Sequence, residues 1–148
     1  MSINTEIQGK SYPQTAPYAV GREKVREFAR AVFSTNPLSD NVEAARAAGH
    51  ADLVAPPTFP VVIQELTLQQ LLADPSAGID FTRVVHGNQQ FTYTRSVIAG
   101  DELRATLTVT SVKTLGAHSM VTSETQIVDA DDLHVVTAIS TLVVRGDE

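Results

Sequence analysis

The residue types that could do acid–base or metal chemistry are few in this chain and widely spaced. Its four histidines, His50, His86, His118 and His134, never occur three or four positions apart, as the zinc ligands of one helical face do. The chain has no cysteine, which excludes disulfides, thiolate catalysis and cysteine zinc sites. Phosphate-binding glycine loops and the Gly-x-Ser-x-Gly nucleophile pattern are also absent. We therefore expect neither a metal site nor a cofactor.

The elements that would position any reactive residue begin with a polar, extended arm over residues 1–20. A helix is predicted over 21–33, because apolar residues recur there at positions i, i+3, i+4 and i+7. Asn36-Pro37 ends that helix, since the residue before a proline disfavours helical backbone angles. A short second helix is predicted over 42–48, with Asp40 as its cap.

The rest of the chain changes from one apolar helix to strands. Residues 61–73 are apolar around most of a helix's circumference, which predicts a buried helix. Apolar and polar residues then alternate in four runs, at 89–94, 105–110, 121–127 and 135–144. Tight turns between the runs predict an antiparallel meander. The fold class is therefore α+β, with an antiparallel sheet wrapped around a central apolar helix.

Composition and charge limit the partners of the chain. Its 148 residues suit one domain with a sizeable core, and 43% hydrophobic with 19% charged residues is an ordinary globular balance. The net charge of −6 argues against binding nucleic acid and against docking on an anionic membrane. No apolar run reaches the ~18 residues of a transmembrane helix, and the first residues lack a secretory pattern. We expect a cytoplasmic protein.

Three segments carry a resemblance to a known family, and their order and spacing are more specific than any one of them alone. They are Asn36-Pro37-Leu38 with residues 44–49, Ala55-Pro56-Pro57-Thr58-Phe59, and residues 85–93 running on to 99–103. Over roughly residues 8–145, the chain resembles the MaoC-like hotdog family. In particular, it resembles the N-terminal-type domain of that family and the non-catalytic subunit of mycobacterial heterodimeric (R)-3-hydroxyacyl dehydratases, the UPF0336 type.

The resemblance implies a single hotdog domain over residues 1–148 and an acyl thioester as the ligand. Active members of the family add water to a trans-2-enoyl thioester, or remove it from an (R)-3-hydroxyacyl thioester, carried on coenzyme A or on acyl carrier protein. Their motif is Asp-x-Asn-Pro-Leu-His, in which the Asp and the His act as acid and base. A chain of this type pairs with a hotdog chain that carries the intact motif, or with a second copy of itself.

This sequence departs from the motif at both catalytic positions. Ser34 stands where the family has its Asp, and Ser39 stands where it has its His. A serine hydroxyl does not act as a base near neutral pH without an activating partner. Asp40 is adjacent to Ser39, but a shift of one residue aims its side chain elsewhere. We therefore expect these degenerate positions to supply no catalytic residue.

Four residues remain as candidates for binding the acyl thioester. Asn36 belongs to the retained Asn-Pro-Leu core. Thr58 either caps the buried helix, which is favoured, or bonds to a partner. His86 either hydrogen-bonds across a cleft between two subunits or ties its strand to a neighbouring carbonyl, which is favoured. Gln89 is the fourth candidate; it and Gln90 point to opposite faces of one strand, so that one of the two could line the acyl cleft.

Three functions stay open at this point. The first is a non-catalytic, acyl-binding subunit of an (R)-specific hydratase or dehydratase in fatty-acid metabolism. The second is a stand-alone enzyme of that class with unfamiliar catalytic residues, such as His86 with Asp40. The third is a homodimeric module that binds acyl-coenzyme A without chemistry. All three predict a dimer, because a lone hotdog domain leaves a sheet edge and an apolar surface exposed.

Overall fold

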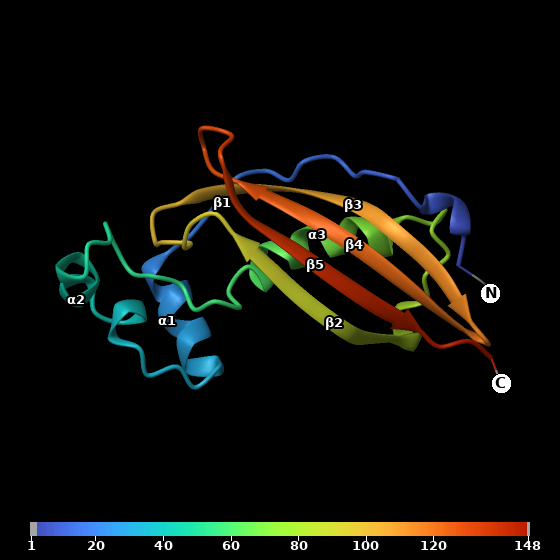
Figure 1. Ribbon diagram of the computed structural model, residues 1–148, viewed down its shortest axis with the longest axis horizontal. Helices are drawn as coiled ribbons and strands as arrows, with labels where there is room; N and C mark the ends of the chain where they lie inside the picture. The colour runs from blue at the N-terminus through green and yellow to red at the C-terminus, as the bar shows by residue number, and fades with distance from the viewer. Residues whose placement is uncertain (1–2, 148) are drawn as a thin grey trace.

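A curled antiparallel sheet of five strands lies over one long helix in the computed structural model, which describes residues 3–147 (Figure 1). The strands are β1 (Tyr18–Ala19), β2 (Val84–Tyr93), β3 (Glu102–Leu115), β4 (His118–Val128) and β5 (His134–Val144), hydrogen-bonded in the order β1-β3-β4-β5-β2. The helices are α1 (Arg22–Ala31), α2 (Val42–Ala47) and α3 (Val61–Ala73), with 3-10 turns at Thr5–Ile7, Pro37–Ser39 and Phe81–Arg83. The predicted fold class, a sheet wrapped around an apolar helix, is confirmed.

Helix α3 packs one side into the curl of the sheet, against β3 and β4. Its side chains Ile63, Leu68 and Leu71 are at most 6% exposed, and burial of each contributes about 1.5–3 kcal/mol. The predicted bounds, 61–73, match the helix, but burial holds for one side only, since Leu66 is 40% exposed. No helix in the described part of the chain is long and apolar enough to cross a membrane.

Strands β3, β4 and β5 form the predicted meander, but β2 departs from it. β2 pairs along its length with β5, with Tyr93 opposite Val136, and not with β3, which follows it in sequence. The meander prediction was therefore wrong for this strand. The connection between β2 and β3, residues 94–101, is too long for a tight hairpin turn. Within it, the guanidinium of Arg95 donates to the carboxylate of Asp101. The connection carries the chain from β2 to the far side of the sheet.

Residues 3–20 form the predicted extended arm, which runs along the free side of β3; Met1 and Ser2 lie outside the described residues. The amide of Gly9 donates to the carbonyl of Val109 at 2.7 Å, and the amide of Tyr12 donates to the carbonyl of Leu107 at 2.9 Å. The arm thereby covers one edge of the sheet. The edge that stays open among the described strands is that of β2, and an unpaired strand edge is a ready template for another strand.

Two predicted helix caps are wrong. Helix α2 is capped by Asn41, whose Oδ1 accepts a hydrogen bond from the amide of Ala44 at 3.0 Å, and not by Asp40. Asp40 instead ends the preceding 3-10 turn. Helix α3 begins after Pro60 without a side-chain cap, so Thr58 does not cap it. The backbone closes that turn instead, because the carbonyl of Thr58 accepts from the amide of Val61.

Candidate functional site

The loop after α1 carries the two positions where the family has its acid and base. Asn36 begins the 3-10 turn, and its Oδ1 accepts a hydrogen bond from the amide of Leu38 at 3.0 Å. Ser39 is 2% exposed, and its Oγ donates to the carbonyl of Val54 at 2.6 Å. A hydroxyl as buried as that of Ser39 needs a hydrogen-bond partner. The Ser39 hydroxyl therefore holds the loop against the segment that leads into α3.

Ser34 lines a depression of about 290 Å³ on one side of this loop, together with Arg26, Asn36, Ser39 and Asp40. Its Oγ accepts from the amide of Asn36 at 3.4 Å. Asp40 is directed to Arg26, with 3.8 Å between its Oδ1 and the Nε of that arginine. Within residues 3–147, no hydrogen bond joins either serine hydroxyl to a carboxylate or an imidazole. Neither serine is activated as a base or a nucleophile.

A pocket of about 350 Å³ opens beside Ser39. It is lined by Asn36, Ser39, Val54, Ala55, Pro57, Tyr93 and Ser96. Three of these residues supply apolar surface and four supply an amide or a hydroxyl. The lining has no carboxylate and no imidazole, so the pocket offers apolar contact and hydrogen bonds without an acid–base pair.

Tyr93 contributes to this pocket from the end of β2. Its hydroxyl donates to the carbonyl of Pro57, which joins β2 to the segment before α3. Burial raises the pKa of Tyr93 to about 12, so the phenol stays protonated at neutral pH and is not a base. Phe91 lies two residues before Tyr93 on β2, and the two rings are 6.4 Å apart. Tyr93 also lines the pocket. Its place in the pocket was missed, because strand alternation does not say what lies at a strand's end.

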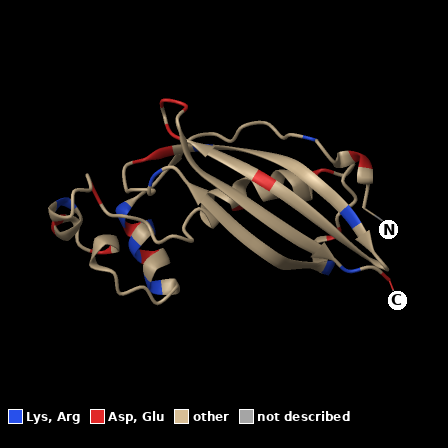
Figure 2. Ribbon diagram, in the orientation of Figure 1, with Lys and Arg blue, Asp and Glu red and all other residues tan. Residues whose placement is uncertain are grey.

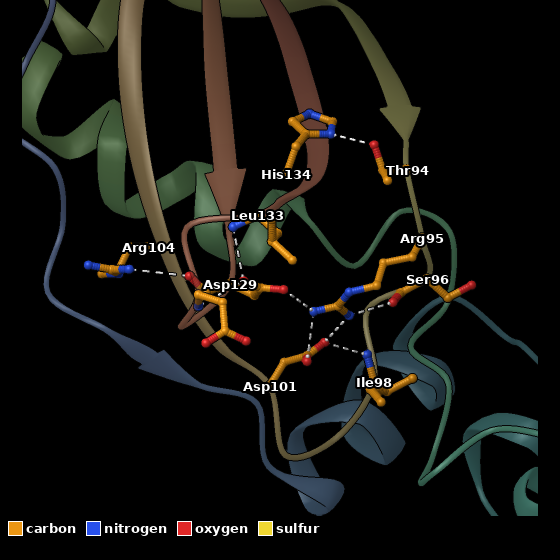
Figure 3. A network of polar contacts seen from close by, with 10 residues as sticks. Thr94, Arg95, Ser96, Ile98, Asp101, Arg104, Asp129, Leu133 and His134 are labelled. Atoms are coloured by element: carbon orange, nitrogen blue, oxygen red, sulfur yellow. Dashed lines mark hydrogen bonds and ion pairs between the residues drawn. The ribbon is translucent and has the colours of Figure 1, made fainter.

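An ion-pair network fixes the segment that supplies Ser96 to the pocket (Figure 3). Arg95 donates to the carboxylate of Asp101 at 2.8 and 3.1 Å, and its Nη2 also donates to Asp129 at 3.3 Å. Asp101 in turn accepts from the amide of Ile98 at 2.9 Å. Paired, charge-assisted bonds of this kind are strong and directional. The network therefore holds the connection after β2 in one conformation against the pocket.

His86 and Gln89 lie on β2 and are not among the residues that line the pocket. His86 is exposed, and its Nε2 is 2.9 Å from the carbonyl of Asn88, which is the tie to a neighbouring carbonyl that was favoured for it. Gln89 faces α3, where its side chain exchanges two hydrogen bonds with Gln64. Gln64 is 2% exposed and was missed by sequence reasoning. No signal in the sequence singled it out, because the same apolar helical run also contains Gln69 and Gln70.

Of the predicted binding residues, the structure places Asn36 in the pocket. Thr58 is exposed next to Pro57 and does not line it. The alternative catalytic pair is not assembled in the pocket either, because Asp40 lines the depression around Ser34 while His86 lies on β2. No group of three or more His, Asp or Glu among the described residues could hold a metal ion.

Comparison with known proteins gives the family. A family model described as "FAS1-like, dehydratase domain region" matches residues 6–138. A UPF0336 protein of Leifsonia xyli subsp. xyli is 75% identical over 146 residues, which cover 99% of this chain and 98% of that protein. A UPF0336 protein of Streptomyces avermitilis is 48% identical over 148 residues, covering 100% of this chain and 99% of that protein.

Solved structures agree with this assignment. A chain of the C-terminally truncated HadBC (3R-hydroxyacyl-ACP dehydratase) complex from Mycobacterium tuberculosis is 32% identical with a TM-score of 0.82, covering 93% of this chain and 96% of that chain. A MaoC-like dehydratase is 29% identical with a TM-score of 0.86, covering 94% of this chain and 42% of that chain. The chain therefore has the hotdog fold and belongs to the UPF0336 proteins, within the FAS1-like dehydratase domain region family.

Proposed function

We propose that the chain is a non-catalytic, acyl-thioester-binding subunit of an (R)-specific enoyl hydratase or 3-hydroxyacyl-thioester dehydratase of fatty-acid metabolism. The observation that carries this proposal is the Ser39 hydroxyl, buried and bonded to the carbonyl of Val54 where the family has its His. The adjoining pocket has no carboxylate or imidazole, and its phenol, Tyr93, is held protonated. Removing or adding water needs a proton acceptor and a donor. This pocket supplies binding groups without them.

The pocket suits one end of an acyl thioester. Val54, Ala55 and Pro57 give it apolar surface, which favours hydrocarbon. The side-chain oxygen of Asn36 accepts a hydrogen bond from the amide of Leu38. The side-chain nitrogen makes no hydrogen bond to any other residue within 3–147, so its N–H groups are free to donate. An amide N–H is a suitable donor to a thioester carbonyl. Asn36 is therefore the binding residue that we propose for this pocket.

The open edge of β2 is the surface on which we place a partner. The amide of Thr94 donates to the carbonyl of Val135 at 2.8 Å, and antiparallel pairs alternate along a strand. Gln89, Phe91 and Tyr93 therefore turn their backbone groups away from β5. A partner's β2 that pairs antiparallel with these groups would continue the sheet across a two-fold axis.

Apolar side chains near the start of β2 support the same edge as an interface. Phe81 is 67% exposed and Val85 is 49% exposed. The opposite edge of the sheet is covered by the N-terminal arm. The HadBC dehydratase, one chain of which is 32% identical to this protein, is itself a complex. In the proposed assembly, a hotdog partner with an intact Asp-x-Asn-Pro-x-His motif supplies the acid and the base.

Co-expression with such a partner tests the proposal. The two chains should co-purify, and the pair should hydrate crotonyl-coenzyme A faster than the partner alone does. A pair that is no more active than the isolated partner would contradict the subunit role. Turnover by this chain alone, abolished by His86→Ala, would instead identify a stand-alone enzyme.

A further inference from the structure

One end of the sheet lies opposite α1 and α2 (Figure 1). A depression with a basic lining lies at that end, where β2 and β4 begin and β5 ends. It measures about 350 Å³ and is lined by Arg83, His118, Arg145 and Gly146. Arg83 directly precedes β2, His118 begins β4, and Arg145 and Gly146 directly follow β5. The order β4-β5-β2 makes these strand ends neighbours. Figure 2 shows basic residues at this end of a chain whose net charge is −6.

Two of the lining side chains have donors that the fold does not use. The guanidinium of Arg145 makes no hydrogen bond or ion pair with any residue within 3–147. The amide of Gly146 donates to Nδ1 of His118 at 3.3 Å. When Nδ1 of a neutral imidazole accepts, the proton is on Nε2, so His118 has an N–H to donate. A guanidinium and an imidazole N–H therefore border the same depression.

Arg83 contributes less uncompensated charge than Arg145, because it is paired with Asp80 at 3.6 Å and with Asp147. The lining itself contains no carboxylate. A guanidinium presents a planar set of donors that matches the oxygens of a phosphate. We propose that this depression binds a phosphate ester, namely that of the pantetheine arm which coenzyme A and acyl carrier protein share.

This inference rests on the proposed function, because it uses the antiparallel pairing of two β2 strands. Arg83 immediately precedes β2, and Tyr93, at the other end of the strand, lines the pocket beside Ser39. Antiparallel pairing sets the start of one β2 beside the end of the other. The basic depression then adjoins the partner's intact motif. This subunit would hold the carrier of the thioester while the partner performs the chemistry.

Binding by the chain alone tests the anion site independently of any partner. Phosphopantetheine and pantetheine are titrated into the pure protein by calorimetry. The phosphorylated compound should bind more tightly, and Arg145→Ala should weaken it by about tenfold, the loss expected for a charge-assisted hydrogen bond. Lys113→Ala, which removes a cation outside the lining, is the matched control and should change the affinity little. Equal affinity for the two compounds, or equal losses in the two variants, overturns the proposal.

Kinetics of the assembled pair distinguish the two carriers. With Arg145→Ala in this subunit, KM should rise by about tenfold while kcat stays the same, because the carrier is held away from the reacting atoms. A rise for both crotonyl-coenzyme A and crotonyl-acyl carrier protein supports the shared phosphate, and a rise for one of them assigns the site to that carrier. An unchanged KM for both overturns the proposal. Phosphate-dependent binding without any complex would leave the site standing and reject the subunit role.

Discussion

Gln64 on α3 and Gln89 on β2 exchange two side-chain hydrogen bonds, at 2.9 and 2.7 Å, between the central helix and the open edge strand. Gln64 is 2% exposed, so water does not reach its amide easily. A buried amide without a partner is costly, and each of these two satisfies the other. The pair therefore fixes how the helix meets the strand on which we place a partner.

Removing one member of this pair should cost more than removing both. Gln89→Leu leaves the buried amide of Gln64 unpaired and should lower the free energy of unfolding by about 1–3 kcal/mol. The double variant Gln64→Leu/Gln89→Leu should recover most of that loss, because both polar groups are replaced together. Urea denaturation measures the double variant and each of the single variants, Gln64→Leu and Gln89→Leu. Gln90→Leu, an exposed position on the other face of β2, is the control. A double variant as unstable as the two single losses added together would show that the amides are uncoupled.

The two serines that replace the catalytic residues should differ sharply in their effect on stability. Ser39→Ala leaves the carbonyl of Val54 without its hydroxyl partner and should lower the free energy of unfolding by about 1–3 kcal/mol. Ser34→Ala loses only a 3.4 Å contact with the amide of Asn36 and should stay within about 0.5 kcal/mol of the unchanged chain. Thermal unfolding at neutral pH measures both. Similar losses in the two variants would remove the structural role assigned to Ser39.

Asp52 should make the fold sensitive to acid. Arg22 donates to its carboxylate at 2.8, 3.0 and 3.2 Å, and this hydrogen bonding lowers the pKa of Asp52 to about 2. In the unfolded chain, an aspartate titrates near pH ~3.9. The unfolded state therefore binds more protons between these values, so the contribution of Asp52 is present above pH ~4 and is lost as the pH falls towards about 2.

Asp52→Asn should accordingly destabilise the protein at pH 7 and flatten the dependence of unfolding free energy on pH in that acidic window. Urea denaturation at a series of pH values measures the slope. Asp131→Asn, at an exposed position in the β4–β5 turn, is the matched control and should leave the slope unchanged. The ion pair with Arg22 has no part in acid stability if both variants keep the slope of the unchanged chain.

Helices whose two ends are marked by prolines or other stop signals could be predicted from the sequence. The residue that caps a helix could not. The bounds of α3 match the prediction because Pro60 precedes its apolar run and Asp74-Pro75 follows it. The cap of α2 was misplaced by one residue, since Asp40 and Asn41 are both good acceptors. The 3-10 turn decides between them, because it ends at Asp40 and leaves Asn41 next to the helix.

The neighbours of each strand could not be predicted in the same way. Alternation along β2 correctly set Gln89 and Gln90 on opposite faces, but period alone does not say that β2 pairs with β5. The pocket depends on that pairing, because it brings Tyr93 to the loop of Ser39. Resemblance to the family singled out Ser34 and Ser39, and the structure adds that the hydroxyl of Ser39 is already engaged.

A charge on the open edge of β2 should block association without unfolding the chain. Val85 is 49% exposed on this strand, so Val85→Lys places an ammonium where a paired strand would desolvate it. The variant should sediment as a monomer and should fail to co-purify with a hotdog partner, while its circular dichroism and melting temperature stay close to those of the unchanged chain. Leu133→Lys is the matched control, because Leu133 is 63% exposed in the turn between β4 and β5. If Val85→Lys assembles as well as Leu133→Lys does, the interface is not at β2, and the placement of the basic depression beside a partner's catalytic motif is lost with it.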